Sequence, residues 1–189
     1  MYRRSWTATG GSAPGKALLA TTAYTSGTPP TLPTLRAQRS GHVLNIGSVG
    51  GFATAPAVGL YGASKFALEG IPEALHGELA PLGVRVTIIE PGGFRTDFLN
   101  SSGIQVEPAG IVDYVAGAGP VREALAKNDG RQPGDPAKAA KAVVDVTEAA
   151  EPPLRLQLGA DAVERVEAKP DLVRRELDQW RHVALSTAI

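Results

Sequence analysis

The chain has 189 residues, of which 43% are hydrophobic, so its length favours one domain over two and it can bury an ordinary core. Its 19 basic and 19 acidic side chains cancel, and no basic excess argues for nucleic acid or a membrane as a partner. Cysteine is absent and histidine occurs three times, which excludes disulfides and disfavours a zinc site. No apolar run approaches the roughly 20 residues that span a bilayer. These observations favour a cytoplasmic location and predict no bound metal.

The neutral charge is an average over two unlike parts of the chain. Residues 1–68 hold six basic side chains and no acid, whereas residues 69–189 hold 13 basic and 19 acidic ones. Residues 1–34 also carry eight of the 13 threonines and show no sustained apolar period of either 2 or 3.6. We therefore expect residues 1–34 to be an irregular segment outside the native fold. A short apolar patch after Arg3 and Arg4 is too short for a targeting peptide.

Residues 35–189 read as a domain in which strands and helices alternate. Residues 42–48 predict a short strand, and residues 84–90 predict a buried, β-branched one that ends at Pro91. Between them, residues 61–80 place apolar side chains on one helical face. Pro72 removes a backbone donor within that helix, which predicts a kink or a break there.

The C-terminal half continues the alternation. Residues 97–133 predict a mixture of helix and loop, and Asp135 followed by Pro136 is typical of a helix start with a buried stripe at Ala139, Val143, Val146 and Ala150. Residues 154–158 predict a third strand, followed by two terminal helices, 161–168 and 171–183, with Pro170 between them. This order predicts an α/β fold with a parallel sheet and helices across its faces.

Three polar side chains stand where such a sheet binds ligands. Ser48 lies at the carboxyl end of a strand, and Tyr61 and Lys65 lie four residues apart at the start of a helix, so they share one helical face. An adjacent ammonium lowers the pKa of a phenol, which makes tyrosine usable as a general acid or base. A serine hydroxyl beside it can orient a carbonyl oxygen. Each feature alone is more often structural, but their joint occurrence in order favours a catalytic site.

These residues lie in two of three segments that resemble motifs of the short-chain dehydrogenases/reductases. The segments are Val-Leu-Asn-Ile-Gly-Ser at 43–48, Tyr-Gly-Ala-Ser-Lys at 61–65 and Pro-Gly-Gly-Phe-Arg-Thr at 91–96. They are similar to the family's catalytic strand, its Tyr-x-x-x-Lys helix and its Pro-Gly motif. The resemblance runs from about Pro33 to the C-terminus and implies a Rossmann-type, doubly wound parallel sheet that is truncated on its N-terminal side.

The resemblance implies NAD(P)-dependent hydride transfer between an alcohol and a ketone or aldehyde. By that resemblance, Tyr61 is the general acid/base, Lys65 lowers the pKa of Tyr61 and holds the nicotinamide ribose, and Ser48 binds the substrate oxygen. The cofactor, NAD or NADP, would be held by Tyr61, Lys65, Pro91, Gly92, Phe94 and Thr96. Residues 97–133 would be the variable substrate loop, and a homo-oligomer is the assembly common in the family.

The family's cofactor turn has no counterpart at the front of the chain. Residues 9–15 place their glycines out of register with Thr-Gly-x-x-x-Gly-x-Gly, no predicted strand precedes them, and Pro14 intrudes. The family's Asn-Asn-Ala-Gly segment and its helix asparagine are also unmatched. Residues 10–16 resemble a P-loop, but Ala17 replaces the hydroxyl residue that binds Mg²⁺.

The residues therefore favour a catalytic domain over 35–189 preceded by a frame-shifted or mis-started segment at 1–34. The strand at 42–48 is then expected to present an unpaired edge. Two functions stay open: an oxidoreductase of the family, or a non-catalytic fragment that acts as an association module. Dinucleotide binding distinguishes them.

Overall fold

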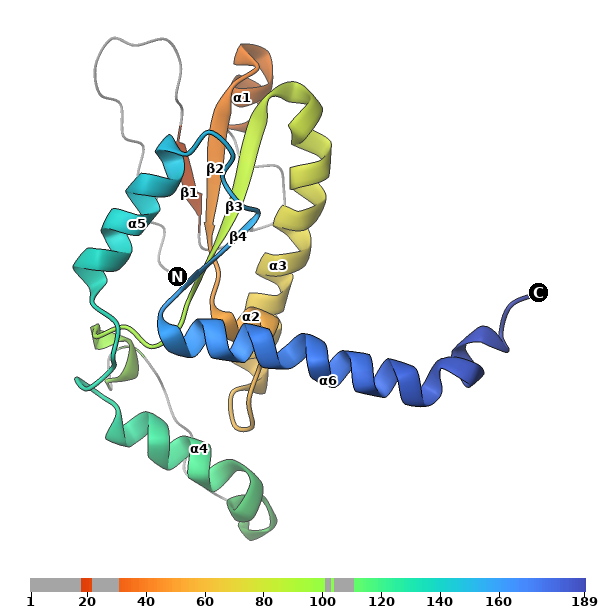
Figure 1. The fold of residues 1–189 in the computed structure, drawn as a ribbon. Helices are drawn as coiled ribbons and strands as arrows, with labels where there is room; N and C mark the ends of the chain where they lie inside the picture. Colours follow the sequence, from red (N-terminus) through yellow and green to blue (C-terminus); the bar gives the residue numbers. More distant parts are fainter. Residues whose placement is uncertain (1–17, 22–30, 101–102, 104–110) are drawn as a thin grey trace.

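The computed structural model describes residues 18–21, 31–100, 103 and 111–189, and these form a parallel sheet with helices on both faces (Figure 1). The sheet has four strands in the order β1-β2-β3-β4. In chain order the elements are β1 Leu18–Thr21, α1 Leu32–Gln38, β2 Gly41–Ile46, α2 Val49–Phe52, α3 Gly59–Leu79, η1 Ala80–Leu82, β3 Val84–Pro91, η2 Asp97–Leu99, η3 Val112–Tyr114, α4 Val115–Lys127, α5 Pro136–Glu148, β4 Arg155–Leu158 and α6 Ala160–Leu185.

The two central strands, β2 and β3, are buried along nearly their whole length, as expected for strands covered on both faces. Their parallel register pairs Val43 with Val86 and Ile46 with Ile89. Successive side chains point to opposite faces of a strand, so β2 and β3 each supply two layers of core. The predicted strands at 42–48, 84–90 and 154–158 are confirmed as β2, β3 and β4.

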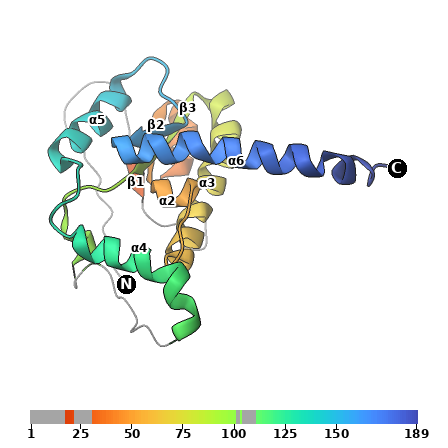
Figure 2. The ribbon, with the colours of Figure 1, turned by 60° about the horizontal axis from the view of Figure 1, so that its bottom comes forward.

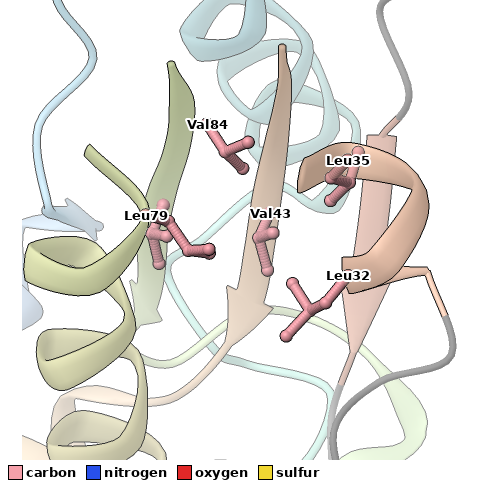
Figure 3. Packing of buried hydrophobic residues seen from close by; sticks show 6 residues of the cluster. Leu32, Leu35, Val43, Leu79 and Val84 are labelled. Atoms are coloured by element: carbon pink, nitrogen blue, oxygen red, sulfur yellow. The ribbon is translucent and has the colours of Figure 1, made fainter. Parts of the chain in front are cut away.

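One face of the sheet is covered by α1 and α3. The cluster there takes side chains from α1, β2, α3 and β3, namely Leu32, Leu35, Val43, Leu79, Val84 and Val86. Figure 3 shows the labelled members of this cluster gathered between α3 and α1. On the opposite face, α5 packs Val146 against Leu44 and Ile89. Helices therefore lie on both sides of the sheet, which confirms the Rossmann-type α/β fold class.

The strand β1 corrects two expectations. Residues 18–21 form a strand that pairs in parallel with β2, from Leu18 opposite His42 to Thr21 opposite Asn45. The edge of β2 is therefore paired. Residues 1–34 also contain regular structure, because β1 lies within them. A four-residue strand in a parallel sheet need not alternate, so no period marks it in the sequence. Residues 1–17 and 22–30, including the P-loop-like segment, lie outside the described residues. The boundary at residue 34 between an irregular segment and a catalytic domain stays a prediction.

Two of the prolines that lie inside helices, Pro72 and Pro170, stand where the sequence predicts a helix to kink or break. The helix α3 runs through Pro72 from Gly59 to Leu79, so the predicted break is absent. Pro72 is fully buried, and its packing offsets the backbone hydrogen bond it removes. The two predicted terminal helices are one helix, α6, which runs through Pro170. Strong helix formers, such as Glu167 and Arg174, flank that proline on both sides.

The start of α5 follows the sequence prediction. Asp135 caps the helix by accepting a hydrogen bond from the backbone N–H of Ala137 at 2.8 Å, and Pro136 is its first residue. The predicted buried stripe is confirmed at Val146, is only partly buried at Ala139 and Val143, and is wrong at Ala150, which lies exposed beyond the helix end. None of the helices among the described residues is both long and apolar enough to cross a membrane. The cytoplasmic location stays a prediction.

Candidate active site

Ser48 lies where the chain leaves β2 and enters α2. The N–H of Gly47 donates to the carbonyl of Ile89 at 2.9 Å, which fixes the strand end against β3. Ser48 is the extended N-cap of α2, and its hydroxyl oxygen accepts a hydrogen bond from the Gly50 N–H at 3.1 Å. The hydroxyl still has its own hydrogen to donate, so this buried serine can act on an oxygen atom at the carboxyl edge of the sheet.

Tyr61 and Lys65 lie in the first two turns of α3, on the same face. The Lys65 ammonium lies 5.9 Å from the centroid of the Tyr61 ring. It donates a hydrogen bond to the carbonyl oxygen of Ile46 at 3.1 Å, which ties α3 to the end of β2. Burial lowers the pKa of Lys65 from its ordinary value because desolvation disfavours the charged form. The structure thus brings together all three residues predicted to be catalytic.

Gly50 is the point at which Ser48 and Tyr61 meet. A β-carbon on Gly50 would lie 3.2 Å from Cε1 of Tyr61 and 3.4 Å from Oγ of Ser48. The bare Cα therefore lets the phenol ring approach the turn that carries the serine. No local pattern marks Gly50 as a site residue, although it follows Ser48 by two residues, because only the packing of α3 reveals what it contacts.

Two more glycines allow α2 and α3 to pack at backbone distance. A β-carbon on Gly51 would lie 2.6 Å from the carbonyl oxygen of Lys65, and one on Gly62 would collide with the side chain of Thr54. Neither collision can be relieved without moving one of the two segments. The contact therefore sets where α3 presents Tyr61 and Lys65 relative to Ser48.

The loop after β3 reaches the same region. The ring of Phe98, on η2, lies 5.7 Å from the Tyr61 ring, with the two planes inclined by 52°. Aromatic pairs in this range of distance and tilt attract one another. Phe98 was not predicted as a site residue. Its contact with Tyr61 joins segments far apart in sequence, and no local pattern marks it.

The Pro91–Thr96 loop is held by two later elements. The N–H of Gly92 donates to the carbonyl of Leu158 at 2.9 Å, and the N–H of Gly93 donates to the Asp161 carboxylate at 2.7 Å. A β-carbon on Gly92 would collide with that carboxylate. Asp161 was not predicted; it lies in the first turn of α6 and fixes the loop at the carboxyl end of β3.

The remaining predicted cofactor residues lie further along this loop. Phe94 forms a bridge with Gly134, and the hydroxyl of Thr96 accepts a weak hydrogen bond from the N–H of Phe98 at 3.4 Å. The carboxyl ends of β2, β3 and β4 thus lie at one edge of the sheet, with α2, α4 and the start of α6 beyond them (Figure 1). Open parallel sheets bind ligands at this edge.

Comparisons with known proteins agree with this arrangement. Residues 19–106 match the model of the family described as short chain dehydrogenase. The chain is 39% identical over 157 residues to oxidoreductase BOA17 of Botryotinia fuckeliana, covering 83% of this chain and 57% of that protein. The chain therefore spans little more than half the length of that relative.

Solved structures give the same result. A short-chain dehydrogenase from Streptomyces avermitilis is 41% identical, with a TM-score of 0.71 over 83% of this chain and 56% of that one. A short-chain dehydrogenase/reductase from Burkholderia phymatum in complex with NAD is 18% identical and shares the fold, with a TM-score of 0.62, over 77% of this chain and 53% of that one. The motifs, the fold and these likenesses agree, and the chain belongs to the short-chain dehydrogenase family.

Proposed function

We propose that the chain is the catalytic half of an NAD(P)-dependent oxidoreductase that transfers a hydride between an alcohol and a ketone or aldehyde. One observation carries the proposal: the Ser48 hydroxyl and the Tyr61 ring converge on Gly50 while Lys65 is anchored beside them on Ile46. A hydrogen-bond donor, a proton-transfer group and a cation then face one small region. That is the set that carbonyl reduction needs at the oxygen atom.

The described residues fit one end of a nicotinamide dinucleotide. In doubly wound sheets the dinucleotide lies across the point where the strand order reverses, and the described strands run β1-β2-β3-β4 without a reversal. Tyr61 and Lys65 would hold the nicotinamide ribose, and Pro91, Gly92, Phe94 and Thr96 would line the nicotinamide side. No Gly-rich pyrophosphate turn of the family type occurs in residues 31–100 or 111–189.

The chemistry of the three side chains, together with their closeness to one another, supports the proposed roles. Ser48 donates its hydroxyl hydrogen to the substrate oxygen and orients it. Tyr61 gives a proton to that oxygen during reduction and takes it back during oxidation, and Lys65 stabilises the negative charge left on the phenol oxygen. A bound nicotinamide would supply the hydride in reduction or accept it in oxidation.

The test is a titration of the purified chain with NADH and with NADPH, followed by nicotinamide fluorescence, and then an assay of carbonyl reduction. We expect binding of at least one cofactor, and Tyr61→Phe should keep that binding while turnover falls about 10²–10⁴-fold because the proton donor is lost. Thr147→Val, which removes an exposed hydroxyl from α5 outside the predicted substrate loop, is the control. Absence of binding up to millimolar cofactor, or full turnover in Tyr61→Phe, contradicts the proposal.

A second candidate is an association module without turnover, and α6 favours it. Apolar or small side chains recur along α6 at alternating spacings of three and four, namely Val163, Val166, Pro170, Val173, Leu177, Trp180 and Ala184. Such a heptad pattern is typical of helices that pair. The C-terminal half of α6 projects beyond the sheet in both views (Figures 1 and 2), and Trp180 is 58% exposed. Sedimentation that shows an oligomer, together with no cofactor binding, would favour this candidate; an oligomer that also binds cofactor fits a homo-oligomeric enzyme.

A further inference from the structure

A cluster of charged side chains lies beneath the active site, between α3, the carboxyl end of β3 and the start of β4. Arg155, the first residue of β4, places its Nε 2.9 Å from Oε2 of Glu69 and 3.5 Å from Oε1 of Glu90. Its Nη2 pairs with Glu73, which lies one turn after Glu69 on α3. Gln157 donates to Oε2 of Glu90 at 2.9 Å. One guanidinium therefore faces three carboxyl groups.

Two of these carboxyl groups are cut off from water. Glu69 is 6% exposed and Glu90 is fully buried. Among the described residues, Oε1 of Glu69 and Oε1 of Glu90 each find no hydrogen-bond donor. A buried carboxylate oxygen without a donor is costly. Because both groups converge on the same Arg155 nitrogen, each lies where it could supply the donor that the other lacks.

The balance of charge in this cluster also favours a proton shared between Glu69 and Glu90. Arg155 is shared with the more exposed Glu73, so the two buried carboxyl groups together have less than one full positive charge to offset them. Two like charges that share a buried site cannot both ionise cheaply, and such pairs bind one proton between them.

We propose that Glu69 keeps its proton up to about neutral pH and donates it to Glu90, and that this shared proton positions the active site above it. Glu69 follows Lys65 by one turn of α3, and a β-carbon on Gly47 would lie 3.4 Å from Oε1 of Glu69. Glu90 directly precedes Pro91. The shared proton therefore links α3, which carries Tyr61, to the start of the loop at Pro91. It also lies close to the end of β2, which leads to Ser48.

The groups that face the pair come from three elements. Glu73 lies on α3 itself, Glu90 on β3 and Arg155 on β4. The other elements packed on α3 add no titratable group there: α2 and η1 contain none, and the histidine of β2, His42, bonds to Thr87 instead. Burial first, then the charge of Glu90, raises the pKa of Glu69 to about 7, against the lowering effect of Arg155. The unfolded chain releases this proton near pH 4.5, so the folded state loses stability as pH rises from about 4.5 through about 7.

Infrared spectroscopy of the full chain tests the proposal directly. Exposed aspartates and glutamates are ionised at pH 6, so a C=O stretching band of a protonated carboxyl at that pH reports a group with a raised pKa. We expect one such band at pH 6 that vanishes by pH 9, is absent in Glu69→Gln and is retained in Glu73→Gln. The second variant removes a carboxylate from the same arginine and leaves the buried pair intact.

A stability profile gives an independent reading. Glu69→Gln keeps a donor for Glu90 without a titrating proton, so the folded-to-unfolded ratio of the wild type relative to this variant should fall about 200-fold between pH 4 and pH 8. A pH-independent ratio overturns the proposal, as does a wild-type spectrum without the band at pH 6 or a band that persists in Glu69→Gln. If Glu69→Gln fails to fold, infrared spectra of the wild type at pH 6 and pH 9 still test whether a protonated carboxyl is present at the lower pH and lost at the higher one. None of these readings depends on cofactor binding, so they stand apart from the proposed function.

Discussion

At the scale of single residues, the site depends on small contacts made by glycines as much as on its polar side chains. The Tyr61 ring contacts Phe98 and also approaches Gly50, so it has neighbours from two segments. A methyl group on Gly50 would require the phenol ring or the Ser48 turn to give way by a few tenths of an ångström. Displacements of that order misalign reacting groups and lower the rate of catalysis.

We therefore expect Gly50→Ala to reduce turnover about tenfold to a hundredfold while the protein stays folded, because alanine favours the helical backbone of α2. Gly70→Ala on α3 is the matched control, since a β-carbon there meets nothing within 4 Å. The measurements are kcat for carbonyl reduction and the thermal unfolding midpoint. Equal turnover in the two variants would show that the approach of Tyr61 to Gly50 is not needed.

The sequence identifies the polar residues of the site but not those that hold them. Ser48, Tyr61 and Lys65 stand at strand ends and helix starts that local patterns mark, and the structure brings them together. Asp161 is different, because its hydrogen bond to Gly93 joins positions 68 residues apart. Such a contact follows from the sheet topology, which no local period encodes.

At the scale of elements, α6 shows how a proline can mislead. Its backbone is helical from Ala160 to Leu185, although Pro170 has no N–H to donate to the carbonyl of Val166. Local signals predict β2, β3 and the cap of α5 well, because strand composition and capping act within a few residues. Helix continuity at Pro170 and the pairing of β1 depend on neighbours in space or on flanking propensity summed over several turns.

Pro170→Ala should restore the missing backbone hydrogen bond and stabilise the C-terminal half of α6 by about 3 kcal/mol. Amide hydrogen exchange in residues 171–185 should slow accordingly. Pro72→Ala offers the contrast, because Pro72 is fully buried and loses packing when it is shortened. Unchanged exchange in Pro170→Ala would mean that the helix does not depend on the hydrogen bond at this position.

At the scale of the whole molecule, two buried groups oppose each other in their response to pH. His42 lies within hydrogen-bond distance of Thr87, 2.9 Å from Nε2 to Oγ1, and Thr87 donates to the carbonyl of Pro153. Burial, with a smaller effect from Arg85, lowers the pKa of His42 from 6.5 to about 4. As pH falls, the unfolded chain binds a proton at His42 at a higher pH than the folded chain does. His42 therefore lowers the free energy of unfolding by about 3 kcal/mol between pH 6.5 and pH 4.

Glu69 has the opposite effect between about pH 4.5 and 7. We expect the two effects to cancel, so that stability changes little across the overlapping range of pH 4.5–6.5. His42→Gln removes one of them, and the stability of this variant should rise steadily as pH falls through that range. Urea unfolding at a series of pH values measures this. His76→Gln, at an exposed histidine of α3, is the control, and identical pH profiles for the two variants would contradict the expectation.

The parallel order of the sheet also bears on how the chain folds. Parallel neighbours are joined by long crossovers, and the contacts between β3 and β4 close larger loops than those between β2 and β3: Glu90 meets Gln157 across 67 positions, whereas His42 meets Thr87 across 45. Loop-closure entropy and distant pairing slow the assembly of such sheets. We expect β2, α3 and β3 to assemble first and β4 to dock last. Arg155 then reaches the two buried glutamates only at the end of folding, so the charge balance of the interior is completed by the final strand.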